Sequence, residues 1–128
     1  MPLGAASKAK LATCHGELQL LIERVANGVD EGDLTYAGVK DIVVTCGYRG
    51  EAEQNKAVAE GNSRLPWPCS KHNRTPSDAV DVVPYPEKWS DAEKLKVLHA
   101  YIAGVAHGMG ISLFDISWDL PHVQRAVP

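Results

Sequence analysis

The sequence lacks a long apolar run, an excess of basic residues and a paired set of cysteines. Its densest apolar stretch, Leu18 to Ile22, is far shorter than the roughly 20 residues that span a bilayer, so we expect no membrane insertion. The formal net charge is -3 at pH 7, which provides no basic field for a phosphate backbone, and we expect no nucleic-acid partner. Cys14, Cys46 and Cys69 have no CxxC spacing and are interpreted as free thiols of a reducing compartment.

Length and composition are those of one folded domain. The chain has 128 residues, of which 45% are hydrophobic and 23% charged, so we expect a single domain over 1–128, acting as a monomer, with its own core. Residues 1–10 contain no apolar segment of the kind found in signal peptides, and we expect synthesis in the cytoplasm.

Apolar spacing predicts three helices. Apolar side chains recur every three or four residues over 7–27, where the following glycine should end the helix. A second helix is expected over 51–60 because this segment is rich in Ala, Glu, Gln and Lys. The third begins at a capping box, Ser90 to Glu93, and continues until Gly108 and Gly110 break it.

Short β-branched runs predict the strands. The clearest are 41–46 and 79–83, and two further extended segments are expected around 111–114 and 121–125. The proline-rich stretch 62–76 predicts an ordered loop. The order of elements predicts an α+β fold: a small, mainly antiparallel sheet with three helices packed on it and a functional cleft at the sheet.

Three polar residues stand in or beside the expected strands. Asp81 interrupts an apolar strand, where a carboxylate is costly unless a cation or several donors satisfy it. His72 and His122 lie near other strand ends, and two imidazoles with one carboxylate are a common ligand set for catalytic zinc. The spacing alone leaves the alternative open that the histidines are solvated surface groups. Asp78 competes with Asp81 as the ligand.

Several motifs resemble one peptidase family. The segments are Ser70-Lys71-His72, Pro76 to Pro86, and Asp119-Leu120-Pro121-His122, with further agreement over 12–19 and 46–55. Together they resemble phage endolysins of the VanY-like D-alanyl-D-alanine carboxypeptidase and L-alanyl-D-glutamate peptidase family.

The resemblance implies roles for particular residues. His72, Asp81 and His122 match the Zn²⁺ ligands of the family, and Asp119 matches its catalytic acid and base, with Asp115 as the fallback. Arg49 matches an arginine that binds substrate or stabilises the oxyanion.

Other side chains have weaker or competing interpretations. Gln54 and Ser70 are further candidates for substrate contacts, although Ser70 could instead orient the loop that carries the first histidine. The segment 110–118 is shorter than in relatives and lacks their glycine pair, so the shape of the cleft stays open. His99 and His107 are expected to be solvated.

The expected function is zinc-dependent hydrolysis of an amide bond in the stem peptide of bacterial peptidoglycan. We expect an L-alanyl-D-glutamate endopeptidase, made in the host cytoplasm by a phage and acting on the cell wall as a lysin. The alternatives are a D-alanyl-D-alanine carboxypeptidase, an inactive metal-bearing domain that binds the wall, and a thiol-dependent hydrolase that uses Cys69.

Overall fold

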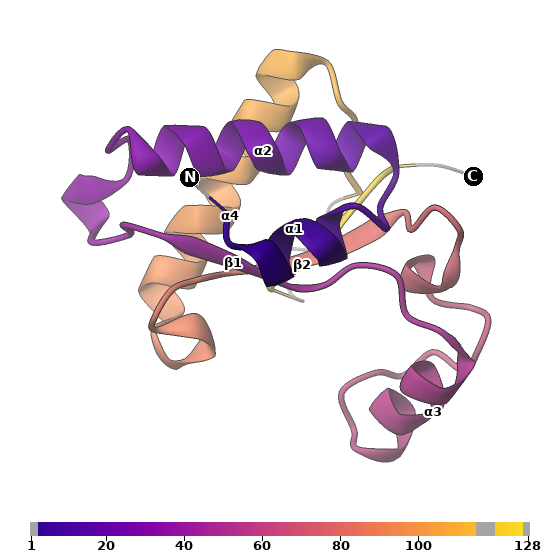
Figure 1. Ribbon diagram of the computed structural model, residues 1–128. Helices are drawn as coiled ribbons and strands as arrows, with labels where there is room; N and C mark the ends of the chain where they lie inside the picture. Colours follow the sequence, from indigo (N-terminus) through magenta and orange to yellow (C-terminus); the bar gives the residue numbers. More distant parts are fainter. Residues whose placement is uncertain (1–2, 115–119, 127–128) are drawn as a thin grey trace.

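The computed structural model describes residues 3–114 and 120–126 (Figure 1). Three short 3-10 helices lie in the connections: η1 (Thr35–Ala37), η2 (Lys71–Asn73) and η3 (Lys88–Ser90). The helices and strands follow in the order α1 (Ala5–Leu11), α2 (Gly16–Asp30), β1 (Ile42–Cys46), α3 (Glu51–Ala59), β2 (Ala79–Pro84), α4 (Ala92–Met109) and β3 (His122–Gln124).

A three-stranded antiparallel sheet of order β1-β2-β3 organises the fold, which confirms the predicted α+β class. Helices α1, α2 and α4 share one apolar core with the sheet, whereas α3 stands apart from them beyond the end of β1 (Figure 1). The core includes Leu21 of α2, Leu98 of α4 and Val80 of β2, none of which is exposed. Burial of these side chains supplies the main driving force for the fold.

The central strand, β2, separates this core from a polar face. Successive strand residues point to opposite faces, and Val80 and Val82 belong to the core cluster. Asp81 between them therefore points away from the helices. The apolar alternation of the strand thus determines which way the carboxylate faces.

The register of the sheet brings three polar residues into one row. Asp81 pairs with Cys46 of β1 on one side and with His122 of β3 on the other. The register shifts between Val44 and Cys46, and this β-bulge brings the cysteine opposite the aspartate. Bulges are frequent beside functional sites because they re-aim a side chain.

The first predicted helix is two helices. The chain leaves the helical conformation between α1 and α2, where Cys14 forms a bridge with Ser77 and His15 has a non-helical ψ of 147°. The His15 ring then accepts a hydrogen bond from the backbone N–H of Glu17 and caps α2. The prediction of one continuous helix was wrong because both helices pack on the same core and therefore keep the same apolar spacing.

The predicted stop at Gly28 was also wrong, since α2 continues to Asp30. A side chain at Gly28 would overlap the Tyr101 hydroxyl, which approaches from α4 and donates a hydrogen bond to Asp33. Glycine is required there by close packing of two helices and not by a turn.

Three smaller predictions need correction. Asp91, and not Ser90, caps α4: its carboxylate accepts a hydrogen bond from the backbone N–H of Lys94. Gly108 lies within α4, and only Gly110, with a φ of 73°, ends the helix. The segment 111–114 contributes only a bridge between its Leu113 and Arg125, so the extended segment expected there is not a strand.

None of the helices in the described part of the chain combines the length and the apolar character needed to cross a membrane.

Removing a core side chain tests the assignment of the core. Leu98→Ala should lower the free energy of unfolding by about 2–5 kcal/mol, because it leaves a cavity between α4 and the sheet. The matched control, Leu20→Ala, removes a side chain that is 61% exposed and should change stability by about 0.5 kcal/mol or less. Urea unfolding of both variants measures the difference, and equal losses would contradict the assignment.

Candidate active site

The site forms where the polar face of β2 meets a short loop. Asp81 and His122 come from neighbouring strands, and His72 comes from η2. Ser70 caps η2 by accepting a hydrogen bond from the His72 backbone N–H at 3.2 Å. The His72 carbonyl in turn accepts a hydrogen bond from the Arg49 backbone N–H at 2.8 Å. These bonds fix the backbone of His72, and Ser70 also lines the neighbouring cleft, so both roles that the sequence left open for Ser70 stay predictions.

Three donor atoms of the site lie at the corners of a nearly equilateral triangle. His72 Nε2 is 3.2 Å from His122 Nδ1, and each of these nitrogens is 3.3 Å from Asp81 Oδ1. Ligand atoms bonded to one four-coordinate cation at about 2.0–2.1 Å are separated by about 3.3 Å. The triangle therefore has the dimensions of a site for a small divalent cation.

The buried oxygen of Asp81 has no hydrogen-bond partner. Among the described residues, Oδ1 is the one buried side-chain oxygen or nitrogen atom in this condition. A buried carboxylate oxygen without a donor is costly, and each such group calls for an explanation. A cation between this oxygen and the two imidazoles would satisfy it.

The far nitrogen of each imidazole is already engaged. His72 Nδ1 lies 2.7 Å from the Gly47 carbonyl, and His122 Nε2 lies 3.0 Å from the side-chain oxygen of Gln124. A carbonyl oxygen accepts only, so each of these nitrogens donates. Such partners of metal-binding histidines orient the ring and select the tautomer whose other nitrogen can bind a cation.

The electrostatics of the site favour a bound cation. Burial disfavours charge on Asp81, but the adjacent imidazoles of His122 and His72 outweigh it and hold the pKa of the carboxyl well below its ordinary value. Burial also opposes charge on His72, yet Asp81 and Cys46 outweigh it and raise the pKa of the imidazole to about 10. Asp81 is therefore ionised and attracts either a proton on His72 or a metal ion.

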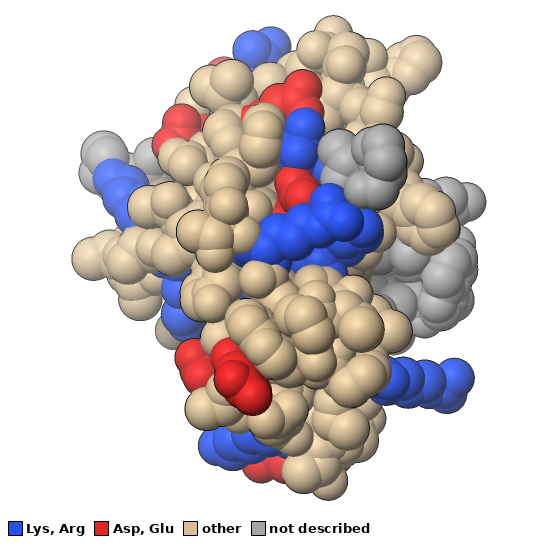
Figure 2. All heavy atoms as spheres, turned by 90° about the vertical axis from the view of Figure 1, so that its right-hand side faces the viewer, with Lys and Arg blue, Asp and Glu red and all other residues tan. Residues whose placement is uncertain are grey.

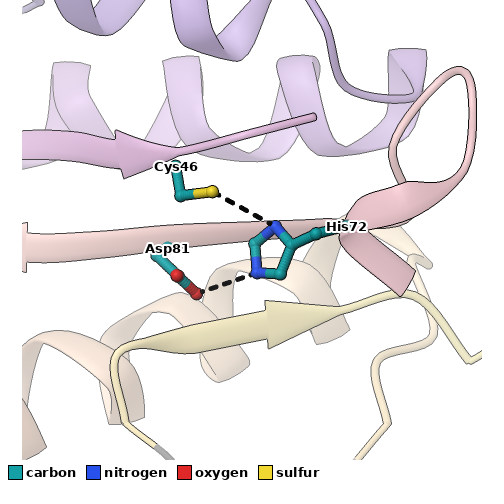
Figure 3. Close-up of side chains that lie close together, drawn as sticks. All are labelled: Cys46, His72 and Asp81. Atoms are coloured by element: carbon teal, nitrogen blue, oxygen red, sulfur yellow. Dashed lines mark hydrogen bonds and ion pairs between the residues drawn. The ribbon is translucent and has the colours of Figure 1, made fainter. Parts of the chain in front are cut away.

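Cys46 is a neighbour of this site that the sequence did not indicate. Its sulfur lies 3.7 Å from His72 Nδ1, while the Asp81 carboxylate approaches the opposite nitrogen of the same ring (Figure 3). Cys46, His72 and Asp81 can be grouped as a second possible donor set. His72 Nδ1, the nitrogen nearest to Cys46, already donates to the Gly47 carbonyl and cannot also bind a cation. In the set that includes His122, the nitrogens that face Asp81 are His72 Nε2 and His122 Nδ1, and neither donates to a carbonyl.

The thiol of Cys46 has an unusual environment for a cysteine. Burial raises its pKa, but His72 and Arg49 outweigh that effect and lower the pKa below the ordinary value. In the sequence, Cys46 is marked only as the last residue of the predicted strand 41–46, which is a weak indication of a place in the site. Its position opposite Asp81 depends on the bulge, which the sequence does not reveal.

Arg49 stands beside the triangle, held by a buried glutamine. Its guanidinium lies 3.8 Å from the second oxygen of Asp81 and donates to Gln54 Oε1 at 3.1 Å. The Gln54 side chain is fully buried and also accepts from Asn73, so we expect it to position the arginine and not to contact a substrate.

Asp78, the competing candidate for a metal ligand, forms ion pairs with two arginines instead. Its carboxylate lies 3.1 Å from Arg74 and 2.7 Å from Arg125, and these cations lower its pKa by outweighing the effect of burial. It is absent from the triangle. The structure therefore places Asp81, and not Asp78, beside the two imidazoles.

Other sequence expectations have mixed outcomes. Asp119 and Asp115 lie outside the described residues. Cys69 is exposed in its loop. His99 was expected to be solvated, and this was wrong: it is half-buried, its Nε2 lies 2.8 Å from the Val82 carbonyl, and burial lowers its pKa. His107 is exposed, as predicted.

A cleft of about 1040 Å³ opens onto the triangle. Its lining includes Arg49, the loop 61–65, Trp89 and the three residues of the triangle. Two imidazoles, a carboxylate and an arginine at a cleft of this size form the kind of site that metal-dependent hydrolases use.

The chain belongs to the phage L-alanyl-D-glutamate peptidase family, whose model matches residues 1–123. Among solved structures it is similar to the crystal structure of the Serratia marcescens L-Ala D-Glu endopeptidase ChiX, with a TM-score of 0.67 and 26% sequence identity. That similarity covers 95% of this chain and 87% of the other. No curated protein matches the sequence.

The role of Gln54 can be tested by removing its hydrogen bonds at nearly constant volume. Gln54→Met should lower the free energy of unfolding by about 1–3 kcal/mol, because the groups it now pairs lose their partner in a buried position. Asn55→Met, at the exposed neighbouring position of α3, is the control. Should both variants unfold at the same urea concentration, the buried network would not contribute to stability.

Proposed function

We propose that this chain is a zinc-dependent endopeptidase that hydrolyses the L-alanyl-D-glutamate bond of the peptidoglycan stem peptide. The observation that carries the proposal is the triangle formed by Asp81 Oδ1, which has no hydrogen-bond partner, and the two imidazole nitrogens. The triangle lies in a chain of this peptidase family. A phage lysin made in the host cytoplasm and acting on the wall as a monomer accords with the family.

Zinc accords with the chemistry of the donors. His72, Asp81 and His122 would hold the ion through two neutral nitrogens and one carboxylate oxygen, a set that leaves a coordination position open. Bound Zn²⁺ supplies Lewis-acid polarisation of the scissile carbonyl and activation of the attacking water.

Two further residues would act on the reacting groups. Arg49 lies beside Asp81 and can donate to the carbonyl oxygen as negative charge develops there. Asp119, three positions before His122 in the motif Asp-x-x-His, would take a proton from the attacking water and pass it to the leaving amine.

The bond cleaved follows from the family and its solved relative. The family is one of L-alanyl-D-glutamate peptidases, and the similar Serratia marcescens protein is an L-Ala D-Glu endopeptidase. Both favour this bond over the terminal D-alanyl-D-alanine bond. Digestion of the wall separates these options, because the first cut exposes new D-glutamate amino termini and the second releases free D-alanine.

Incubation of purified peptidoglycan with the zinc-loaded protein tests the proposal. We expect new D-glutamate amino termini, lost in His72→Ala and Asp81→Ala, and lowered about 10²- to 10⁴-fold in Asp119→Ala because proton transfer is removed. His107→Ala and Cys69→Ser should retain activity, and a chelator should abolish it until zinc is restored. Wall binding without any cut would indicate a binding domain, and chelator-resistant activity lost in Cys69→Ser would indicate a thiol hydrolase.

Metal-dependent stability provides a test that needs no substrate. Zinc at about 100 times its dissociation constant should stabilise the native protein by about 2.7 kcal/mol, and Asp81→Asn should lose most of this gain. Asp30→Asn, an exposed change at the end of α2, is the control. Thermal unfolding with and without zinc measures the effect, and an undiminished zinc response in Asp81→Asn would contradict its role as a ligand.

A further inference from the structure

The cleft is positively charged although the chain is not. The whole chain has a formal net charge of -3, yet the described residues that line the cleft include Arg49, Arg64 and Lys71 against a single acidic residue, Asp81. Asp81 belongs to the candidate metal site. The remaining charge of the cleft is therefore basic, which favours a substrate with carboxylates.

Two of these cations have no partner within the described part of the chain. Arg64 and Lys71 make no side-chain hydrogen bond or ion pair there, although Lys71 is only half-exposed. Arg125, by contrast, lies 2.7 Å from the carboxylate of Asp78. On the face shown in Figure 2, the basic side chains near the centre lie beside acidic ones, whereas some nearer the edge have no acidic side chain next to them.

The unpaired cations stand on a fixed framework. The Gln54 amide donates to Ser63 Oγ at 3.0 Å and to the Leu65 carbonyl at 2.7 Å, and these acceptors flank Arg64 on both sides. The same buried side chain holds Arg49 through its oxygen. One glutamine therefore connects the Arg49 guanidinium to the backbone that carries Arg64.

Lys71 is held by the loop that carries the metal-site histidine. It is the first residue of η2, directly before His72, and its carbonyl accepts a hydrogen bond from the Asp78 backbone N–H at 3.1 Å. A backbone that is already ordered lowers the cost of binding a charged ligand, because only the side chains must be fixed on binding.

We propose that Arg64 and Lys71 bind the free carboxylates of the stem peptide on the D-glutamate side of the cleaved bond. This inference rests on the proposed function. A D-glutamate that is linked onward through its side chain keeps a free α-carboxylate beside the scissile amide, and guanidinium and ammonium groups are its natural partners. Arg64 and Lys71 thus determine specificity for the ionised peptide over its amidated form.

A matched pair of synthetic stem peptides tests the proposal. The two peptides differ only in whether the D-glutamate α-carboxyl is free or amidated, and kcat/KM is measured on both. The wild type should prefer the free carboxylate. Arg64→Gln and Lys71→Gln should each reduce this preference about fivefold, mainly through KM, because a partly exposed ion pair is lost. Arg64→Lys should retain most of it.

The control variant is Lys8→Gln, which removes an exposed charge on α1 that does not line the cleft. Equal kcat/KM of the wild type on both peptides, or an unchanged preference in both cleft variants, would overturn the proposal.

Product binding separates this inference from the peptidase activity. Calorimetry with the product peptide that begins with D-glutamate, in its free and amidated forms, needs no cleavage. A carboxylate preference that is lost in Arg64→Gln and Lys71→Gln supports the site even if the parent peptide were not cut. Equal binding of both products by the wild type rules the site out, whether or not the bond is cleaved.

Discussion

The site depends on one carboxylate in the middle of a sheet. Asp81 stands on the central strand, where its neighbours Val80 and Val82 are drawn into the helical core and it is turned the other way. Its buried oxygen has two imidazole nitrogens at 3.3 Å and no hydrogen-bond partner. The folding of the core thus forces an ionised group into a position where it needs a bound cation or a protonated imidazole beside it.

The rest of the architecture positions partners for that carboxylate. Antiparallel pairing brings His122 beside it, and η2 brings His72. Carbonyl acceptors on the far nitrogens then aim both imidazoles at Asp81. The cleft wall depends in a similar way on Gln54, a buried polar side chain that joins Arg49 to the loop 63–65. Buried polar networks of this kind confer rigidity because each group loses its partner if one moves.

Sequence-based prediction succeeded where a pattern is local. The apolar spacing of α4, the β-branched runs of β1 and β2, and the glycine stop at Gly110 all depend on neighbouring residues, and the structure has these elements. It failed where a distant contact decides the backbone. The break before α2 depends on a bridge to Ser77, and Gly28 is required by Tyr101 of another helix.

The sequence by itself determined the residue types of the site and, through the alternation of β2, the side of the sheet that Asp81 faces. Only the tertiary structure decided that His72 and His122, fifty positions apart, meet within 3.2 Å, that a bulge brings Cys46 beside them, and that Gln54 is internal. The physical reason is that alternation is a local property of the backbone, whereas strand register and loop position are set by long-range packing and hydrogen bonds.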